Sequence, residues 1–364
     1  MTSSGMPSPL RATRSYFGKG DEQDVDHPTQ SLRFMLITAS FVVIIAGLQA
    51  AAPLLLPFLL SIFLVILSLP LLVWLQGKGI PTALAVLLTV LANIVFLATI
   101  VVIVGGSVER FTEEAPKYAD SLQQTAAGLL TWLQGKGINV SPEIPVNPGA
   151  VMGLVGQMFN SLASVLSHFV LVVITTIFIL FEATQFPQKL RLALGGRDGN
   201  SETFSRIILE VQRYLVLKTL ISIPTGLLIG VWVAVLGLDF PVLWGLLAFL
   251  FNYVPNLGSI IAAIPAVLLA LVQLGPSTAA LVGIGYLVVN MALGNFVEPY
   301  LMGRKFGLST LVVFLSLVFW GWVWGPFGML LSVPLTMVVK ILLENSEDYQ
   351  WVAVLLGPTP AQDG

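Results

Sequence analysis

The sequence has few charged residues, only two histidines and no cysteine. Charged side chains make up 10% of the 364 residues, whereas soluble domains carry about a quarter. The absence of cysteine excludes disulfides, thiolate chemistry and cysteine-ligated metals. The two histidines, His27 and His168, stand in unrelated surroundings. We therefore expect no metal or haem site.

The sequence also lacks the motifs of nucleotide-dependent and catalytic proteins. It contains no phosphate-binding loop, no catalytic triad and no carboxylate pair arranged for acid–base catalysis. No basic stripe is interleaved with aromatic residues, and the net charge is −2. We therefore expect neither an enzyme nor an ATP-driven pump, and neither a cofactor nor a nucleic-acid partner.

Apolar residues take the place of the missing charges. They make up 56% of the chain, and the mean hydropathy is positive. Between Asp239 and Glu298, 58 consecutive residues contain no Asp, Glu, Lys or Arg. A membrane helix needs only about 20 apolar residues, so this run holds more than one membrane segment. The composition predicts a polytopic membrane protein with the lipid bilayer as its surroundings.

Lys and Arg positions predict the organisation of the chain across the membrane. They cluster before residue 34 and again over residues 185–215, so both regions are expected in the cytoplasm. Six full spans are expected, near residues 34–52, 53–75, 81–106, 157–183, 216–237 and 278–297. The expected domains are a disordered cytoplasmic tail (1–33), N-terminal transmembrane helices (34–106), an extracytoplasmic amphipathic segment (107–156), a transmembrane transport core (157–342) and a cytoplasmic tail (343–364).

Two apolar blocks in the C-terminal half are too long for one span and too short for two. Residues 240–274 would extend about 52 Å as one helix, against a hydrocarbon core of about 30 Å. Pro and Gly interrupt this block at residues 252–258, and a second block, 309–340, is interrupted at residues 321–326. We therefore predict an all-α polytopic protein of about eight membrane segments, two of them re-entrant hairpins forming an inverted repeat. A single crossing by 240–274 would instead place Arg304 and Lys305 outside, against the positive-inside rule.

The hairpin tips and the span between them carry the candidate site residues. Broken helices at membrane depth expose backbone groups that bind substrates in transporters, although the same residues also cap and kink buried helices. The expected substrate-binding residues are Asn252, Pro255, Asn256, Gly258, Ser259, Asn290, Asn295, Trp320, Trp324 and Gly325. Glu298 is the candidate proton or sodium carrier, sharing a helix face with Asn295, or it only pairs with Arg304 in water. Lys218 is expected to reach out to the cytoplasmic membrane surface.

Three motifs resemble signatures of the autoinducer-2 exporter family of bacterial membrane proteins. They lie at residues 252–259, 295–304 and 320–334, and the resemblance covers about residues 34–342. It implies a solute exporter with a mobile transport domain that is homo-oligomeric, pentameric in studied members. Some relatives are assigned sodium/proton antiport instead. For this reason the cargo does not transfer with the fold, and this chain also departs from the Gly-Gln pair of many members, with Leu217 and Lys218 at those positions.

These observations predict a secondary transporter in the bacterial cytoplasmic membrane with both termini in the cytoplasm. Its cargo is expected to be a small polar solute, similar to the quorum-sensing signal autoinducer-2, moved outward. Two alternatives stay open. One is a sodium/proton antiporter. The other is a non-transporting membrane scaffold that docks partners on residues 107–156.

Overall fold

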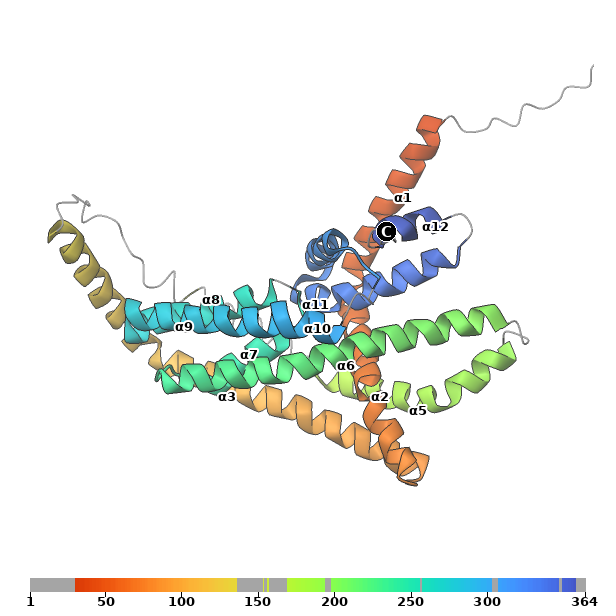
Figure 1. Cartoon of the computed structure of the whole chain (residues 1–364), viewed down its shortest axis with the longest axis horizontal. Helices are drawn as coiled ribbons and strands as arrows, with labels where there is room; N and C mark the ends of the chain where they lie inside the picture. The colour runs from red at the N-terminus through yellow and green to blue at the C-terminus, as the bar shows by residue number, and fades with distance from the viewer. Residues whose placement is uncertain are drawn as a thin grey trace, which may run out of the picture. The chain divides into compact units, whose positions relative to one another are not determined.

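Helices form all the regular structure in the part of the chain that the computed structural model describes, which is residues 30–135, 153, 156, 169–193, 198–255, 257–302, 307–346 and 349–357. The all-α prediction is confirmed for these residues, and Figure 1 shows their arrangement. The chain falls into two units, Met1–Gly47 and Leu48–Gly364. The helices are α1 (Gln30–Ala50), α2 (Ala52–Gly77), α3 (Thr82–Gly135), α5 (Phe169–Ala193), α6 (Asp198–Val235), α7 (Pro241–Phe251), α8 (Gly258–Leu274), α9 (Pro276–Asn290), the π-helix η1 (Met291–Val297), α10 (Glu298–Met302), α11 (Thr310–Glu344) and α12 (Gln350–Leu356).

Five of the described helical segments are long and apolar enough to cross a membrane. They are Ala52–Gly77, Thr82–Tyr118, Ser205–Val235, Pro276–Leu301 and Thr310–Glu344. This finding supports an integral membrane protein on length and composition. The finer expectation, eight segments with two re-entrant hairpins, stays a prediction.

Two helices extend further than the sequence patterns predict. The third span was expected to end near residue 106, but α3 continues to Gly135, and residues 107–135 of the expected amphipathic segment form its second half. Likewise, α6 begins at Asp198, well before the span expected at 216–237. The reason is that hydropathy marks where a membrane ends, not where a helix ends. Polar residues after Gly106 continue the helix, and Pro116 is accommodated inside it.

Small residues let α6 and α7 pack closely. Gly226 and Gly230, four residues apart on α6, face Gly245 of α7. A Cβ atom at Gly226 would lie 2.6 Å from the Gly245 carbonyl oxygen. Close approach over a Gly-x-x-x-Gly face is a common way to join helices in membranes, because no apolar effect drives them together there. This contact holds α7, the first helix of the first hairpin, against α6.

Both predicted helix breaks are present. α7 ends at Phe251 and α8 begins at Gly258, so the first break lies where the sequence places it. α11 is interrupted by non-helical backbone at Trp324 and at Gly325, whose φ is 63°. The indole Nε1 of Trp320 donates to Thr336 Oγ1 over 3.2 Å. Sixteen residues of continuous helix would separate them by about 24 Å, so the two arms of α11 fold back on each other.

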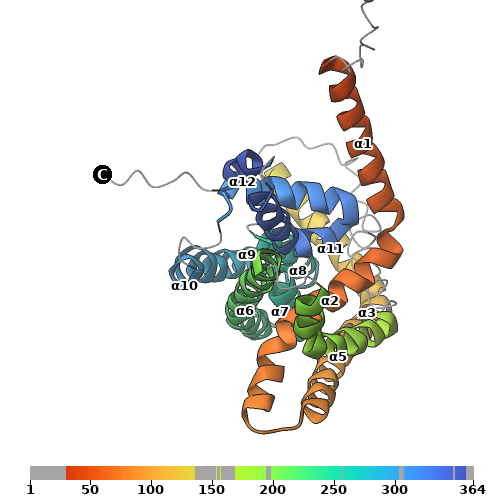
Figure 2. The ribbon, with the colours of Figure 1, turned by 90° about the vertical axis from the view of Figure 1, so that its right-hand side faces the viewer.

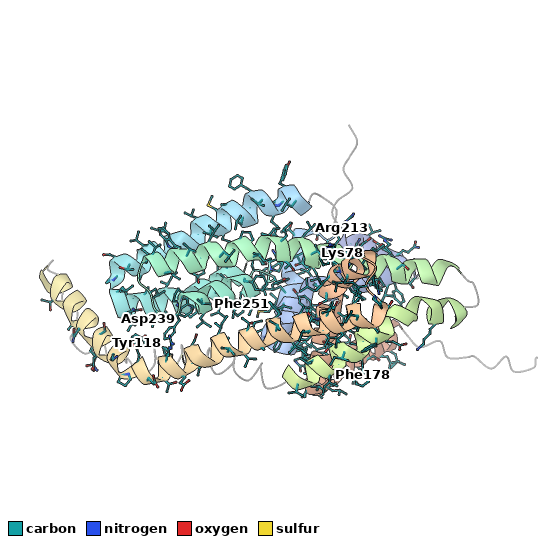
Figure 3. The ribbon with its side chains drawn as sticks, turned by 90° about the horizontal axis from the view of Figure 1, so that it is seen from below. Lys78, Tyr118, Phe178, Arg213, Asp239 and Phe251 are labelled. Carbon is teal, nitrogen blue, oxygen red and sulfur yellow. The ribbon has the colours of Figure 1, made fainter. Side chains whose placement is uncertain are left out.

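The base of the first hairpin, where α7 begins and α8 ends, is tied together and to α3. Tyr118 of α3 donates its hydroxyl to Asp239 Oδ2 over 2.8 Å, and the two residues lie side by side in Figure 3. Ser121, one turn further, donates to the Val272 carbonyl near the end of α8. The Asp239 amide donates to Gln273 Oε1 over 3.1 Å. Both ends of the hairpin base are therefore bound to one helix and to each other.

A second packing unit lies where α2 and α3 meet α5. Figure 2 shows α5 beside α2 and α3, and the three helices contact one another. Ser61 of α2 donates to the Val172 carbonyl of α5 over 3.0 Å. Leu72, Val86 and Leu180 are buried in the cluster between them. These three helices contribute to the wall of the cavity between the hairpin tips, described below.

Candidate functional site

The tip of the first hairpin is a tight turn that depends on glycine. Pro255 lies in the turn, and Gly258 begins α8. A Cβ atom at Gly258 would overlap the Phe251 carbonyl oxygen and approach Val254 Cβ to 3.1 Å. Pro255 and Gly258 therefore shape the turn. Asn256, expected beside them, lies outside the described residues.

Polar side chains hold this tip on one face of α6. Asn252, only 6% exposed, donates its amide to Ser222 Oγ over 2.9 Å. Tyr253 and Thr219 share a hydrogen bond of 2.5 Å between their hydroxyls. Asn252 was predicted as a site residue, but its three neighbours were not. The signal was available, since Thr219 and Ser222 lie three residues apart in the mostly apolar second half of α6.

Two further predicted residues join the hairpin to the following span. Ser259 of α8 donates to Asn290 Oδ1 of α9 over 2.6 Å. Asn290 is the last residue of α9, and the π-helix η1 follows it directly. Single π-helical turns are rare and occur often at functional sites. The structure thus brings Ser259 and Asn290 together next to an irregular stretch of helix.

The charged residues of this region form a pair. Lys218 Nζ of α6 lies 2.5 Å from Glu298 Oε1 of α10, and the lysine side chain is 3% exposed. The expectation that Lys218 reaches the membrane surface is therefore wrong. Its side chain is buried within the protein, where it pairs with Glu298, 80 residues further along the chain. The alternative pairing of Glu298 with Arg304 falls on residues that the structure does not describe.

The π-helix explains why Glu298 points toward α6. The expected i,i+3 relation between Asn295 and Glu298 assumes α-helical spacing, but η1 spans residues 291–297 and widens the turn there. Asn295 is exposed, whereas the Glu298 carboxylate is 21% exposed and contacts Lys218. The structure therefore does not bring Asn295 and Glu298 together on one face.

The tip of the second hairpin uses its tryptophans as hydrogen-bond donors. Trp324 donates Nε1 to the Leu48 carbonyl over 3.0 Å, and Trp320 bonds Thr336 within its own hairpin. The two rings lie 5.0 Å apart between centroids. Gly325 supplies the positive φ that turns the chain. Both indole N–H groups are thus used inside the protein.

The two tips line one cavity of about 210 Å³. The first tip contributes Tyr253 and Val254, and the second contributes Pro326, Phe327 and Leu330. α2, α3 and α7 add aromatic rings to the wall, and these rings meet edge to face in three pairs. The pairs, with their centroid distances, are Phe63–Tyr253 (5.8 Å), Phe249–Tyr253 (5.8 Å) and Phe96–Phe249 (6.4 Å).

This cavity differs in chemistry from the polar site that the sequence predicts. None of the expected binding residues is among its described lining, which is apolar and aromatic apart from the Tyr253 hydroxyl. Asn252, Ser259, Trp320 and Trp324 instead bond other parts of the protein. The aromatic residues come from separate helices, so no spacing rule in the sequence would have grouped them.

Comparisons with known proteins identify relatives over most of the chain. Residues 38–348 match the family model described as AI-2E family transporter. The chain is 40% identical over 330 residues to the AI-2 transport protein TqsA of Escherichia coli K12, covering 89% of this chain and 95% of that protein. It is 37% identical over 330 residues to the putative transport protein YhhT of the same organism, covering 90% and 95%. A putative transport protein of Haemophilus influenzae is 37% identical over 335 residues, with coverage of 89% and 96%.

Proposed function

Since the chain belongs to the AI-2E family of transporters, we propose that it is a secondary transporter that exports a small, uncharged polar solute. The protein is an integral membrane transport protein by its family and its helices. Its relative TqsA is named as an AI-2 transport protein, and an autoinducer-2-like signal is the cargo we propose. The outward direction rests on the family resemblance.

The cavity between the tips is the observation that supports this function most directly. It lies where two broken helices meet, which is where substrates bind in many secondary transporters. No Asp, Glu, Lys or Arg is among its described lining residues. An unpaired ion in such a place would have to shed its water without compensation, which costs several kcal/mol. An uncharged solute with C–H faces packs against aromatic rings without that cost.

Filling the cavity tests the proposal. Leu330→Trp adds a bulky ring to the cavity wall, so we expect transport of autoinducer-2 into vesicles to fall at least about tenfold. Leu311→Trp is the matched control, because Leu311 lies on the same helix and is 66% exposed. Equal transport by the two variants, with both correctly inserted, would rule out the tip cavity as the cargo site.

Glu298 is the group we propose for coupling to a cation. Its carboxylate is already neutralised by Lys218, so a proton or sodium ion must compete with the lysine to bind there. Binding would release the contact between α6 and α10 and change how these helices pack. This arrangement also supports the alternative function, sodium/proton antiport, in which the cation is itself the cargo.

We also propose that each hairpin enters and leaves the membrane on a single side, the first on the outer side and the second on the cytoplasmic side, with residues 303–306 and both chain tails in the cytoplasm. The cysteine-free background allows a direct test. Gly303→Cys should resist an impermeant thiol reagent added outside intact cells and react after the cells are opened. Rapid labelling from outside would replace the re-entrant hairpins with plain spans.

Assembly is a further part of the proposal. The family resemblance implies a homo-oligomer, pentameric in studied members. Helices of this chain present many exposed apolar side chains, which neighbouring subunits or lipid would cover.

A further inference from the structure

A short helix follows the second hairpin and lies against it. α12 packs on α11, and Figure 2 shows the two helices side by side. α12 falls within the expected cytoplasmic tail, 343–364, and seven residues of that segment form it. Ala353, near its middle, is 3% exposed and therefore lies on the side that faces the protein. α12 is a docked part of the fold.

α12 connects the two ends of the second hairpin. At its first residue, Gln350 donates its side-chain amide to the Glu344 carbonyl, at the end of α11, over 3.3 Å. At its last residue, the Leu356 carbonyl accepts a hydrogen bond of 3.0 Å from the Ser309 amide, directly before α11 begins. One short helix thus bridges the residues where the hairpin begins and ends. Holding α12 in place therefore holds both ends of the hairpin.

The face of α12 that is turned away from the protein is apolar and aromatic. Trp351 is 65% exposed, Val354 71% and Leu355 69%. These three residues are three or four positions apart, so they share one face of the helix. Tyr349, directly before the helix, is 55% exposed. A helix face in water usually carries polar residues, so this face is expected to have an apolar cover.

Charged residues beside α12 indicate its level relative to the membrane. Glu344 pairs with Lys340 over 2.6 Å and with Arg206 of α6 over 3.0 Å. The 30 residues between Ser309 and Lys340 contain no Asp, Glu, Lys or Arg. Charged groups gather where an apolar helix leaves the hydrocarbon, so this network marks the membrane surface. α12 is bonded to Glu344 and therefore lies at that surface.

The composition and size of the apolar face favour lipid as its cover. Trp and Tyr are enriched at the membrane–water interface, where the ring contacts apolar groups and the polar tip reaches water. A stable contact with another protein needs about 800 Å² on each side, more than four side chains of this size provide. The face also adjoins an apolar surface of the spanning helix, since Leu311, two residues after Ser309, is 66% exposed.

We infer that α12 is a membrane-surface helix whose apolar face lies among lipid headgroups and upper acyl chains, and that it holds the base of the second hairpin at that level. Its partner is the lipid of the surrounding bilayer, in the inner leaflet by the proposed topology. The inference goes beyond the proposed function, because it concerns neither the cargo nor the coupling cation. It gives Trp351, Val354 and Leu355 a role in positioning the hairpin.

Quenching by labelled lipid tests the contact directly. Leu355→Cys introduces a single cysteine into the cysteine-free chain, and a fluorescent maleimide is attached to it. The protein is reconstituted in phosphatidylcholine–phosphatidylglycerol vesicles with lipid that carries a nitroxide near the headgroup. We expect the nitroxide to quench this label at least about threefold more than the same label at Lys189→Cys, a charged position that is 57% exposed. Iodide in the water should quench the two labels in the opposite order.

Substitutions on the apolar face separate insertion of the helix from attraction of the label itself. With the label at Val354→Cys, adding Trp351→Glu and Leu355→Glu should remove the lipid quenching, because a carboxylate loses its hydration in the apolar zone. Trp351→Leu with Leu355→Met is the matched control, which keeps the face apolar and should preserve the quenching.

The holding role has its own measurement. Ala353→Cys places the cysteine on the buried side of α12, where maleimide reaches it only when the helix leaves the hairpin. In vesicles, adding Trp351→Glu and Leu355→Glu should speed this labelling at least about fivefold, because lipid no longer favours the docked position. The same control pair, Trp351→Leu with Leu355→Met, should leave the rate unchanged.

Each outcome supports or overturns a defined part of the inference. Equal lipid quenching at Leu355→Cys and Lys189→Cys shows that the face lies in water, which overturns the inference. A Leu355→Cys label that neither the nitroxide nor iodide quenches shows that protein, such as a second copy, covers the face, which also overturns it. Lipid quenching without a change in Ala353→Cys labelling overturns the holding role. None of these results depends on cargo, so the proposed function is tested separately.

Discussion

Glu298→Gln is expected to abolish the dependence of transport on a proton or sodium gradient and to destabilise the protein. The substitution keeps the shape of the side chain but leaves the Lys218 ammonium, which is 3% exposed, without its counter-charge. Removing one partner of a buried pair costs about 3–5 kcal/mol, and the partial exposure of Glu298 places this case at the lower end. The measurements are gradient-driven transport in vesicles and the thermal unfolding midpoint in detergent.

A second substitution separates stability from coupling. Lys218→Met removes the stranded charge, so Glu298→Gln combined with Lys218→Met should regain most of the lost stability but not the gradient dependence. The matched control is Glu182→Gln, which breaks the pair with Lys189, where both side chains are more than half exposed. Exposed pairs contribute at most about 1 kcal/mol. Gradient-driven transport by Glu298→Gln with an unaltered pH profile would leave Glu298 as a structural residue only.

Alanine at either tip glycine should eliminate transport. At Gly258 a Cβ atom would overlap the Phe251 carbonyl, and at Gly328 it would overlap the Trp320 carbonyl. In both tips the obstacle is backbone, which moves only if the turn opens. Overpacking of this kind costs about 1–3 kcal/mol or more. Transport and the unfolding midpoint should both fall for Gly258→Ala and Gly328→Ala.

The control for the tip glycines lies on the neighbouring helix. Gly283 of α9 has room for a methyl group, with Val267 Cγ2 3.7 Å from the added Cβ, an ordinary contact. Gly283→Ala should therefore behave as the unsubstituted protein does. Normal transport by Gly258→Ala would mean that the first tip tolerates opening, and its tight geometry would then have no part in the mechanism.

The sequence predicted those features that depend on neighbouring residues in the chain. Pro255 with Gly258 and Gly325 with Pro326 mark both helix breaks, because the backbone chemistry of proline and glycine acts locally. The apolar blocks near 53–75, 81–106 and 216–237 likewise lie in helices that are long enough to cross a membrane. The two tip glycines also lie in matching surroundings, each with a residue four positions earlier 3.1 Å from the added Cβ. That similarity supports the predicted inverted repeat of the two hairpins.

Features that depend on distant residues were missed or misplaced. Lys218 pairs with Glu298, which is 80 residues away in the sequence. The apolar residues around Lys218 therefore did not predict that its side chain is buried and paired. The π-helix η1 shifts Glu298 away from the face of Asn295, and no local signal in residues 291–297 announces it. The aromatic cavity combines rings from α2, α3 and α7, which only the folded chain brings together. The polar residues expected to bind substrate at the tips instead make hydrogen bonds inside the protein, with partners far away in the sequence.

The tied base of the first hairpin limits how that hairpin can move. Tyr118 and Ser121 of α3 bind its two ends, and Asp239 is bonded to Gln273 across the base. Because α7 and α8 are tied at this base and joined by the turn at the tip, they move as one unit, and the tip moves only if its hydrogen bonds to Ser222 and Thr219 of α6 also break. A hairpin tied in this way can move only as a lever pivoted at the Asp239–Gln273 contact. Any displacement at Tyr253 is then an angular swing, not a sliding of one helix past the other.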